Sequence, residues 1–133
     1  MSKVRVRVLL ADDNKEMREY VCGVLSAADY EIVATVNDEQ AAVDAATRVL
    51  PDVAVLDVSM PLLNGIQAAK RIIQKHPSIK VLFLSVERDE DLCRAALETG
   101  ALGYVWKPRL GQDLFTALDL AKEGRRFVSE GCE

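Results

Sequence analysis

The sequence has only one histidine, His76, and three cysteines that form no cluster. A structural zinc site needs four ligands drawn mainly from these two residue types, so zinc is not expected. Cys22, Cys93 and Cys132 are widely spaced and odd in number, which argues against a disulfide framework. Reduced thiols in a cytoplasmic protein are the expectation.

Long apolar runs and an excess of basic charge are also missing. No apolar stretch is long enough to cross a bilayer. The basic residues Lys3, Arg5 and Arg7 alternate with valine and do not precede an apolar block, so they do not form a signal peptide. The chain carries 17 basic and 21 acidic residues, a net charge of −4. We therefore expect neither membrane association nor direct nucleic-acid binding.

Aromatic residues make up only 5% of the chain, although half of its residues are hydrophobic. The core must then consist mainly of valine, leucine, isoleucine and alanine, as in helices packed on a parallel sheet. A length of 133 residues suits one domain.

Short aliphatic runs alternate with helical patterns along the chain, which predicts five βα units. The expected fold class is α/β, a doubly wound, five-stranded parallel sheet with helices on both faces. The domain is expected to span residues 1–124, followed by a linker-like tail at 125–133. The expected strands are 4–10, 31–36, 53–56, 81–84 and 102–106.

Polar residues follow four of these strands directly. Asp12 and Asp13 follow the first, Asp57 the third, Ser85 the fourth and Lys107 the fifth. Any one of them alone is more often a helix cap or a loop residue than part of a site. Ligands of open α/β sheets bind beyond the carboxyl ends of the strands, so the whole set predicts a site at that edge.

The chemistry of this set suits phosphoryl transfer. Three carboxylates placed together would repel each other unless a cation neutralises them, and Mg²⁺ prefers such oxygen ligands. Lys107 adds a positive charge that can pair with Asp57 or with a phosphate, and Ser85 adds a hydroxyl donor. An aspartate can act as the nucleophile and form an aspartyl phosphate.

Several motifs match a known family. They are Leu9-Leu10-Ala11-Asp12-Asp13, Val55-Leu56-Asp57, Met60-Pro61, Asn64-Gly65, Leu84-Ser85 and Gly103-Tyr104-Val105-Trp106-Lys107-Pro108. Together they resemble the bacterial two-component response-regulator receiver domain, over roughly residues 4–123. The resemblance implies the flavodoxin-like strand order 2-1-3-4-5.

Carried over by position, the resemblance implies a role for each site residue. Asp57 would accept the phosphoryl group, Lys107 would contact the phosphate, and Ser85 would be the switch hydroxyl. Tyr104 would turn inward when Ser85 moves, which would change the surface formed by the fourth helix, fifth strand and fifth helix. Mg²⁺ would be held by Asp12, Asp13, Asp57 and the backbone carbonyl of Ser59. A cis Lys107–Pro108 bond, common in the family, is also expected.

The resemblance further implies partners. A sensor histidine kinase would supply the phosphoryl group, and a phosphorylation-dependent homodimer is another expected partner. The stretch 94–101 and the tail 124–129 resemble regulators with a C-terminal LuxR-type helix-turn-helix module that controls transcription. Such an output module does not follow here, so the sequence leaves open a receiver cut from a longer chain, which the tail favours, or one that acts alone.

Two departures from the family pattern bear on function. Val86 stands where a small residue is usual, and its branched side chain is expected to narrow access to Asp57. Trp106 replaces an aliphatic residue and is either a core substitution or an exposed anchor for a partner.

Two alternative functions compete with the phosphorylation switch. A haloacid-dehalogenase-type hydrolase also uses an aspartate after a parallel strand, but its motif resembles Asp-x-Asp, whereas Asp57-Val58-Ser59 has serine at the third position. The other alternative is a degenerate receiver that serves as an interaction module without phosphorylation. Val86 favours this reading, and the complete set of acidic, serine and lysine residues argues against it.

Overall fold

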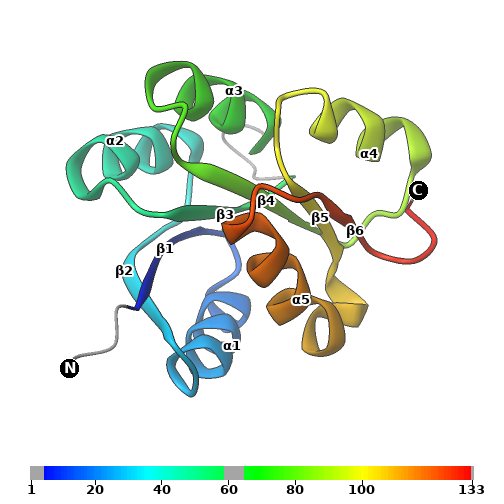
Figure 1. Cartoon of the computed structure of the whole chain (residues 1–133), viewed down its shortest axis with the longest axis horizontal. Helices are drawn as coiled ribbons and strands as arrows, with labels where there is room; N and C mark the ends of the chain where they lie inside the picture. Colours follow the sequence, from blue (N-terminus) through cyan, green and yellow to red (C-terminus); the bar gives the residue numbers. More distant parts are fainter. Residues whose placement is uncertain (1–4, 59–64, 133) are drawn as a thin grey trace.

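A six-stranded parallel sheet forms the centre of the computed structural model, which describes residues 5–58 and 65–132 (Figure 1). The strand order is β2-β1-β3-β4-β5-β6. This confirms the doubly wound fold and the order 2-1-3-4-5, and it adds one short strand at the edge. The strands are β1 (Val6–Ala11), β2 (Tyr30–Val36), β3 (Val53–Asp57), β4 (Lys80–Ser85), β5 (Gly103–Trp106) and β6 (Phe127–Val128).

The helices cover both faces of the sheet and enclose two separate cores. Figure 1 shows α2, α3 and α4 on one face and α1 and α5 on the other. None of the helices in the described part of the chain is long and apolar enough to cross a membrane. The helices are α1 (Lys15–Ser26), α2 (Glu39–Val49), α3 (Gly65–Lys75), α4 (Glu90–Leu97) and α5 (Leu110–Lys122), with the short 3-10 turn η1 (Lys107–Arg109) before α5.

The residues of strand β3 explain why this strand lies in the centre of the sheet. All five of its residues are buried, as expected for a central strand covered on both faces. Because side chains alternate along a strand, Ala54 and Leu56 face the core under α2, α3 and α4, whereas Val53 and Val55 face the core under α1 and α5. Because both faces of β3 are buried, the direction in which the Asp57 side chain points from the end of the strand is fixed.

Polar side chains start the helices that follow the strands. The side chain of Asn14 accepts a hydrogen bond from the Met17 amide at 2.9 Å and caps α1. Asp38 and Asp89 cap α2 and α4 in the same way. Since Asn14 supplies the cap of α1, the neighbouring Asp13 carboxylate is not needed to cap this helix.

The C-terminal segment packs against the sheet. Phe127 donates its amide hydrogen to Leu102 O at 2.8 Å, and Ser129 donates to Tyr104 O at 2.9 Å, so β6 extends the sheet beside β5. A two-residue strand is too short to produce a periodic pattern, which is why the sequence did not predict it. The linker assignment of residues 125–133 stays a prediction.

The expectation of a cis Lys107–Pro108 bond was wrong. The described residues contain no cis peptide bond, and Pro108 lies inside the 3-10 turn that leads into α5. The trans form is the intrinsically preferred isomer, and proline fits the first turn of a helix because its missing N–H has no partner there.

Candidate functional site

The carboxyl ends of four adjacent strands bring the site together. Asp12 follows β1, Asp57 ends β3, Ser85 ends β4, and Lys107 follows β5. The strand register aligns these ends, since Asp57 pairs with Leu84 and Ser85 pairs with Trp106. Residues that are far apart in the sequence therefore meet at one edge of the sheet, as the sequence predicted.

Lys107 lies between two of the carboxylates. Its Nζ is 2.9 Å from Asp12 Oδ2 and 3.4 Å from Asp57 Oδ2. The Lys107 side chain is only 10% exposed, and the Asp12 side chain is fully buried. An ion pair so removed from water is screened little by salt, so Lys107 offsets part of the negative charge of this site.

The turn after β1 is fixed by hydrogen bonds to Asp12. The amide of Asn14 donates to Asp12 Oδ1 at 2.9 Å, and Arg18 Nη1 donates to the Asp12 carbonyl at 2.8 Å. Asp13 is exposed at the mouth of the site. The role of Arg18 could not be predicted from the sequence, because only the winding of α1 brings a residue six positions later back to Asp12.

The acidic residues form a suitable site for a hard cation. Carboxylate oxygens of Asp12, Asp13 and Asp57 all lie within 4.8 Å of one another. Three carboxylates facing one Lys107 ammonium leave an excess of negative charge, and carboxylate oxygens are the ligands that Mg²⁺ prefers. These residues therefore fit the predicted metal. Ser59, whose carbonyl was predicted to complete the site, lies outside the described residues.

Gly65, the first residue of α3, lies very close to the backbone of Asp57. Its amide donates to Val58 O at 2.7 Å. A Cβ atom built on Gly65 would overlap the Asp57 carbonyl oxygen and lie 2.9 Å from the Asp57 carbonyl carbon. Only glycine fits at this point, so the start of α3 can pack directly against the backbone of the predicted phosphoacceptor. From the sequence Asn64-Gly65 was only one of the motifs of the resemblance, and the contact of Gly65 with Asp57 could not be predicted.

The loop between β4 and α4, residues 85–89, connects Ser85 with Tyr104. The Glu87 amide donates to Ser85 Oγ at 2.9 Å, and the Tyr104 hydroxyl donates to the Glu87 carbonyl at 2.9 Å. Tyr104 is fully buried in the core under α2, α3 and α4, and its change of orientation when Ser85 moves stays a prediction. Burial raises the pKa of Tyr104 to about 12, so its hydroxyl stays protonated and can donate throughout the neutral range.

Val86 and Trp106 also meet at this loop. The Val86 side chain is 64% exposed, and the Val86 carbonyl accepts a hydrogen bond from Trp106 Nε1 at 3.0 Å. Trp106 is half-buried beside the core, and the guanidinium of Arg88 stacks on its ring at 4.0 Å from the centroid. Trp106 is thus neither a simple core substitution nor an exposed anchor for a partner, because its side chain binds the loop 85–89 to β5. The effect of Val86 on access to Asp57 stays a prediction.

Comparisons with known proteins show which family this chain resembles in sequence. The family model described as "Response regulator receiver domain" matches residues 8–119. The transcriptional regulatory protein DegU of Brevibacillus brevis is 33% identical over 125 residues, which cover 93% of this chain and 53% of DegU. A protein-glutamate methylesterase/protein-glutamine glutaminase of Haloarcula marismortui is 40% identical over 105 residues, which cover 77% of this chain but only 28% of that protein. The chain therefore spans about half, or less, of these relatives.

Solved structures show the same fold. A LuxR-family response regulator from an Aurantimonas species has a TM-score of 0.91 at 28% identity, covering 96% of this chain and 92% of that one. The receiver domain of the response regulator NarL from Mycobacterium tuberculosis has a TM-score of 0.86 at 30% identity, covering 92% and 100%. The similarity to the methylesterase covers only a small part of that enzyme, so it gives no reason to assign an enzymatic activity to this chain.

Proposed function

The chain belongs to the response-regulator receiver family, and from this premise we propose that it is a phosphorylation switch in which Asp57 accepts a phosphoryl group. The observation that carries the proposal is the position of Lys107, whose ammonium lies between Asp12 and Asp57 at the carboxyl edge of the sheet. The Lys107 ammonium can pair with the Asp57 carboxylate before the transfer and with the phosphate oxygens after it, because both kinds of oxygen accept charge-assisted hydrogen bonds.

The transfer is a nucleophilic displacement at phosphorus. A carboxylate oxygen of Asp57 forms the new O–P bond while the bond from phosphorus to the donor, a phosphohistidine of a sensor kinase, breaks and leaves its electron pair on the imidazole nitrogen. Lys107 and the Ser85 hydroxyl bind the transferred oxygens. Asp12, Asp13, Asp57 and the carbonyl of Ser59 would hold Mg²⁺, which neutralises the charge that these oxygens carry.

Phosphorylation then acts on the loop 85–89. A phosphate on Asp57 offers the Ser85 hydroxyl a charged acceptor, which is stronger than any neutral partner. Ser85 Oγ now accepts a hydrogen bond from the Glu87 amide, so drawing Ser85 towards the phosphate disturbs the position of Glu87 and of the Tyr104 hydroxyl bonded to it. The surface formed by α4, β5 and α5 changes as a result, and a second copy of the chain or an output domain binds it.

The regulated output that fits best is transcription, in the cytoplasm. Support comes from DegU, which is named as a transcriptional regulatory protein, and from the LuxR-family regulator of closely similar structure. A chain that spans about half of DegU corresponds to the receiver part of such a regulator, so the DNA-binding activity would belong to another domain.

Phosphorylation by a small donor tests the proposal. We expect acetyl phosphate with Mg²⁺ to add one phosphoryl group, mapped to Asp57 by mass spectrometry, and Asp57→Asn to abolish the labelling. Asp44→Asn is a matched control, because Asp44 lies on the exposed face of α2 and accepts a hydrogen bond from the side-chain amide of Gln40. Labelling that persists in Asp57→Asn would refute the assignment, whereas a wild-type chain that takes no phosphoryl group would favour the interaction-module alternative.

A further inference from the structure

The C-terminal segment 125–132, which we call the strap, is anchored by a buried hydrogen-bond network. Ser129 is fully buried; its Oγ accepts the Trp106 amide at 3.0 Å and donates to Asp113 Oδ2 at 2.6 Å. Asp113, on the first turn of α5, is 7% exposed and also pairs with Arg109 Nε at 3.2 Å. Short hydrogen bonds to a buried carboxylate are among the stronger ones in proteins, so the strap has a specific docking site.

The same two residues of β5 hold both the strap and the loop 85–89. Through their backbones, Tyr104 accepts the Ser129 amide and Trp106 donates to Ser129 Oγ. Through their side chains, Tyr104 donates to the Glu87 carbonyl and Trp106 donates to the Val86 carbonyl. A displacement of the loop is therefore transmitted to the residues on which the strap is docked.

The end of the strap also touches the loop directly. A Cβ atom on Gly131 would lie 2.8 Å from Arg88 Nη1 and 3.0 Å from Arg88 Cδ, so the strap backbone lies against the Arg88 side chain that stacks on Trp106. Gly131 has a φ of +90°, a conformation that side chains rarely adopt. The positive φ favours glycine where the strap meets the loop.

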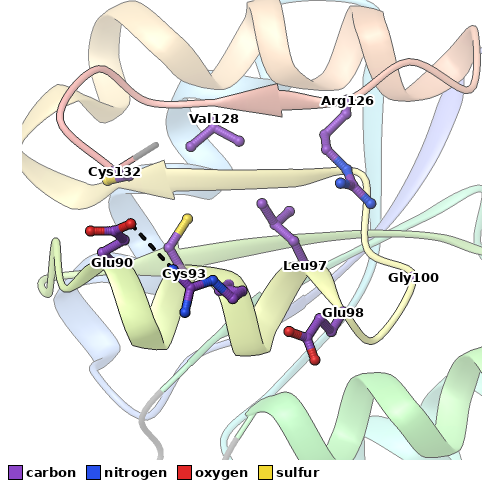
Figure 2. Close-up of a pocket in the computed structure, with 9 residues that line it drawn as sticks. Glu90, Cys93, Leu97, Glu98, Gly100, Arg126, Val128 and Cys132 are labelled. Atoms are coloured by element: carbon purple, nitrogen blue, oxygen red, sulfur yellow. Dashed lines mark hydrogen bonds and ion pairs between the residues drawn. The ribbon is translucent and has the colours of Figure 1, made fainter.

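A groove of about 600 Å³ separates the strap from α4. Figure 2 shows Cys93 and Leu97 of α4 on one wall and Val128 and Cys132 of the strap on the other. Cys132 is only 1% exposed while the strap is docked. Because its burial depends on the strap, the reactivity of the Cys132 thiol reports whether the strap is docked.

We propose that the strap is a conformational sensor that docks when the loop 85–89 is in its present position and is released when Ser85 moves towards a phosphorylated Asp57. This inference rests on the proposed function for its trigger. Moving Ser85 displaces Val86, Glu87 and Arg88, which removes the acceptors of Trp106 and Tyr104 and the stacking partner against which Gly131 lies. By linkage, a docked strap opposes phosphorylation as much as phosphorylation opposes docking.

Thiol labelling measures the docking. In a Cys22→Ser background, N-ethylmaleimide modification of Cys132 is followed by peptide mass spectrometry, with and without Mg²⁺ and beryllofluoride, a mimic of the acyl phosphate. We expect beryllofluoride to accelerate Cys132 labelling by at least about tenfold, the change that follows from losing the two hydrogen bonds that Tyr104 and Trp106 donate to the loop. Ser129→Ala should give a similar acceleration without beryllofluoride. Ser26→Ala should leave the rate unchanged, because the Ser26 hydroxyl bonds only carbonyls of its own helix.

Two further measurements separate this inference from the proposed function. Fluorine NMR reports whether beryllofluoride binds, with Asp57→Asn as the negative control. Binding without faster Cys132 labelling would overturn the sensor and leave the proposed function intact. If beryllofluoride does not bind, the proposed function fails, and Ser85→Ala tests the coupling alone: removing the acceptor of the Glu87 amide should loosen the loop and raise Cys132 labelling. An unchanged rate in Ser85→Ala would then overturn the sensor.

Discussion

Replacing Lys107 with methionine tests how the site balances its charge. Methionine keeps most of the volume of the lysine stem but removes the ammonium that lies 2.9 Å from Asp12 Oδ2 and 3.4 Å from Asp57 Oδ2. The variant leaves a fully buried Asp12 carboxylate and a nearly buried Asp57 carboxylate, with Asp13 within the same 4.8 Å cluster and no ammonium beside them. We expect the folded state to be destabilised in the absence of a metal.

The size of the effect follows from the burial of the groups. At an effective dielectric constant of about 20, each Lys107 contact corresponds to a Coulomb energy of roughly 5 kcal/mol. Desolvation offsets part of this energy, and removing one partner of a buried ion pair typically costs about 3–5 kcal/mol. The matched control is Lys122→Met, since Lys122 is 43% exposed and pairs with Asp119 at 3.5 Å. A surface pair of this kind contributes about 0–1 kcal/mol.

Urea unfolding with and without Mg²⁺ provides the assay. In the Lys107→Met variant a bound cation takes over the neutralisation of the carboxylates, so Mg²⁺ should restore much of the lost stability and should stabilise the variant more than the wild-type chain. At a concentration 100 times its dissociation constant, a ligand that binds only the folded state adds about 2.7 kcal/mol. A loss below about 1 kcal/mol would refute the reasoning, because Lys107 would then contribute no more than a surface ion pair. Equal Mg²⁺ effects in both chains would also refute it, because the ammonium and the cation would then not neutralise the same carboxylates.

Two further changes test the surroundings of the site. Tyr104→Phe removes the hydrogen bond to the Glu87 carbonyl and should cost about 1 kcal/mol. Burial raises the folded-state pKa of Tyr104 from 10 to about 12, so its stabilising contribution is complete below pH 10 and is lost as the pH rises towards 12. The wild-type unfolding free energy should therefore fall more steeply between pH 10 and pH 12 than that of Tyr104→Phe. Parallel curves for the two chains would contradict the role of Tyr104 burial. Gly65→Ala places a Cβ against the Asp57 carbonyl and should destabilise the fold by at least about 1 kcal/mol and slow acetyl-phosphate labelling. Gly23→Ala, with nothing within 4 Å of the new Cβ, should instead stabilise α1 by about 0.5–1 kcal/mol, and equal effects of the two alanines would show that the contact with Asp57 does not matter.

The sequence by itself determined the elements and the edge at which the site lies. The continuous apolar run 53–56 predicts a strand buried on both faces, and the alternation of strands with helices predicts a parallel sheet. In such a sheet the carboxyl ends of adjacent strands must meet, so Asp12, Asp57, Ser85 and Lys107 could be grouped before any distance was known. Local chemistry also sufficed for Asp38 and Asp89, whose side chains cap their own helices.

The tertiary structure decided what depends on contacts between distant segments. Asn14, not its neighbour Asp13, caps α1 in the folded chain, which leaves the Asp13 carboxylate beside Asp57. The trans Lys107–Pro108 bond follows from the turn into α5, which propensity alone does not fix.

The strap shows this limit most clearly. Nothing in the pattern of residues 125–132 indicates a strand, because β6 has only two residues and is stabilised by backbone hydrogen bonds to β5 and by the Ser129 contact with Asp113. Both partners lie more than ten residues away along the chain, and a propensity acts only over a few neighbours. The predicted phosphoacceptor Asp57 could thus be named from the sequence, whereas the connection from Ser85 through Tyr104 and Trp106 to the strap exists only once the chain has folded.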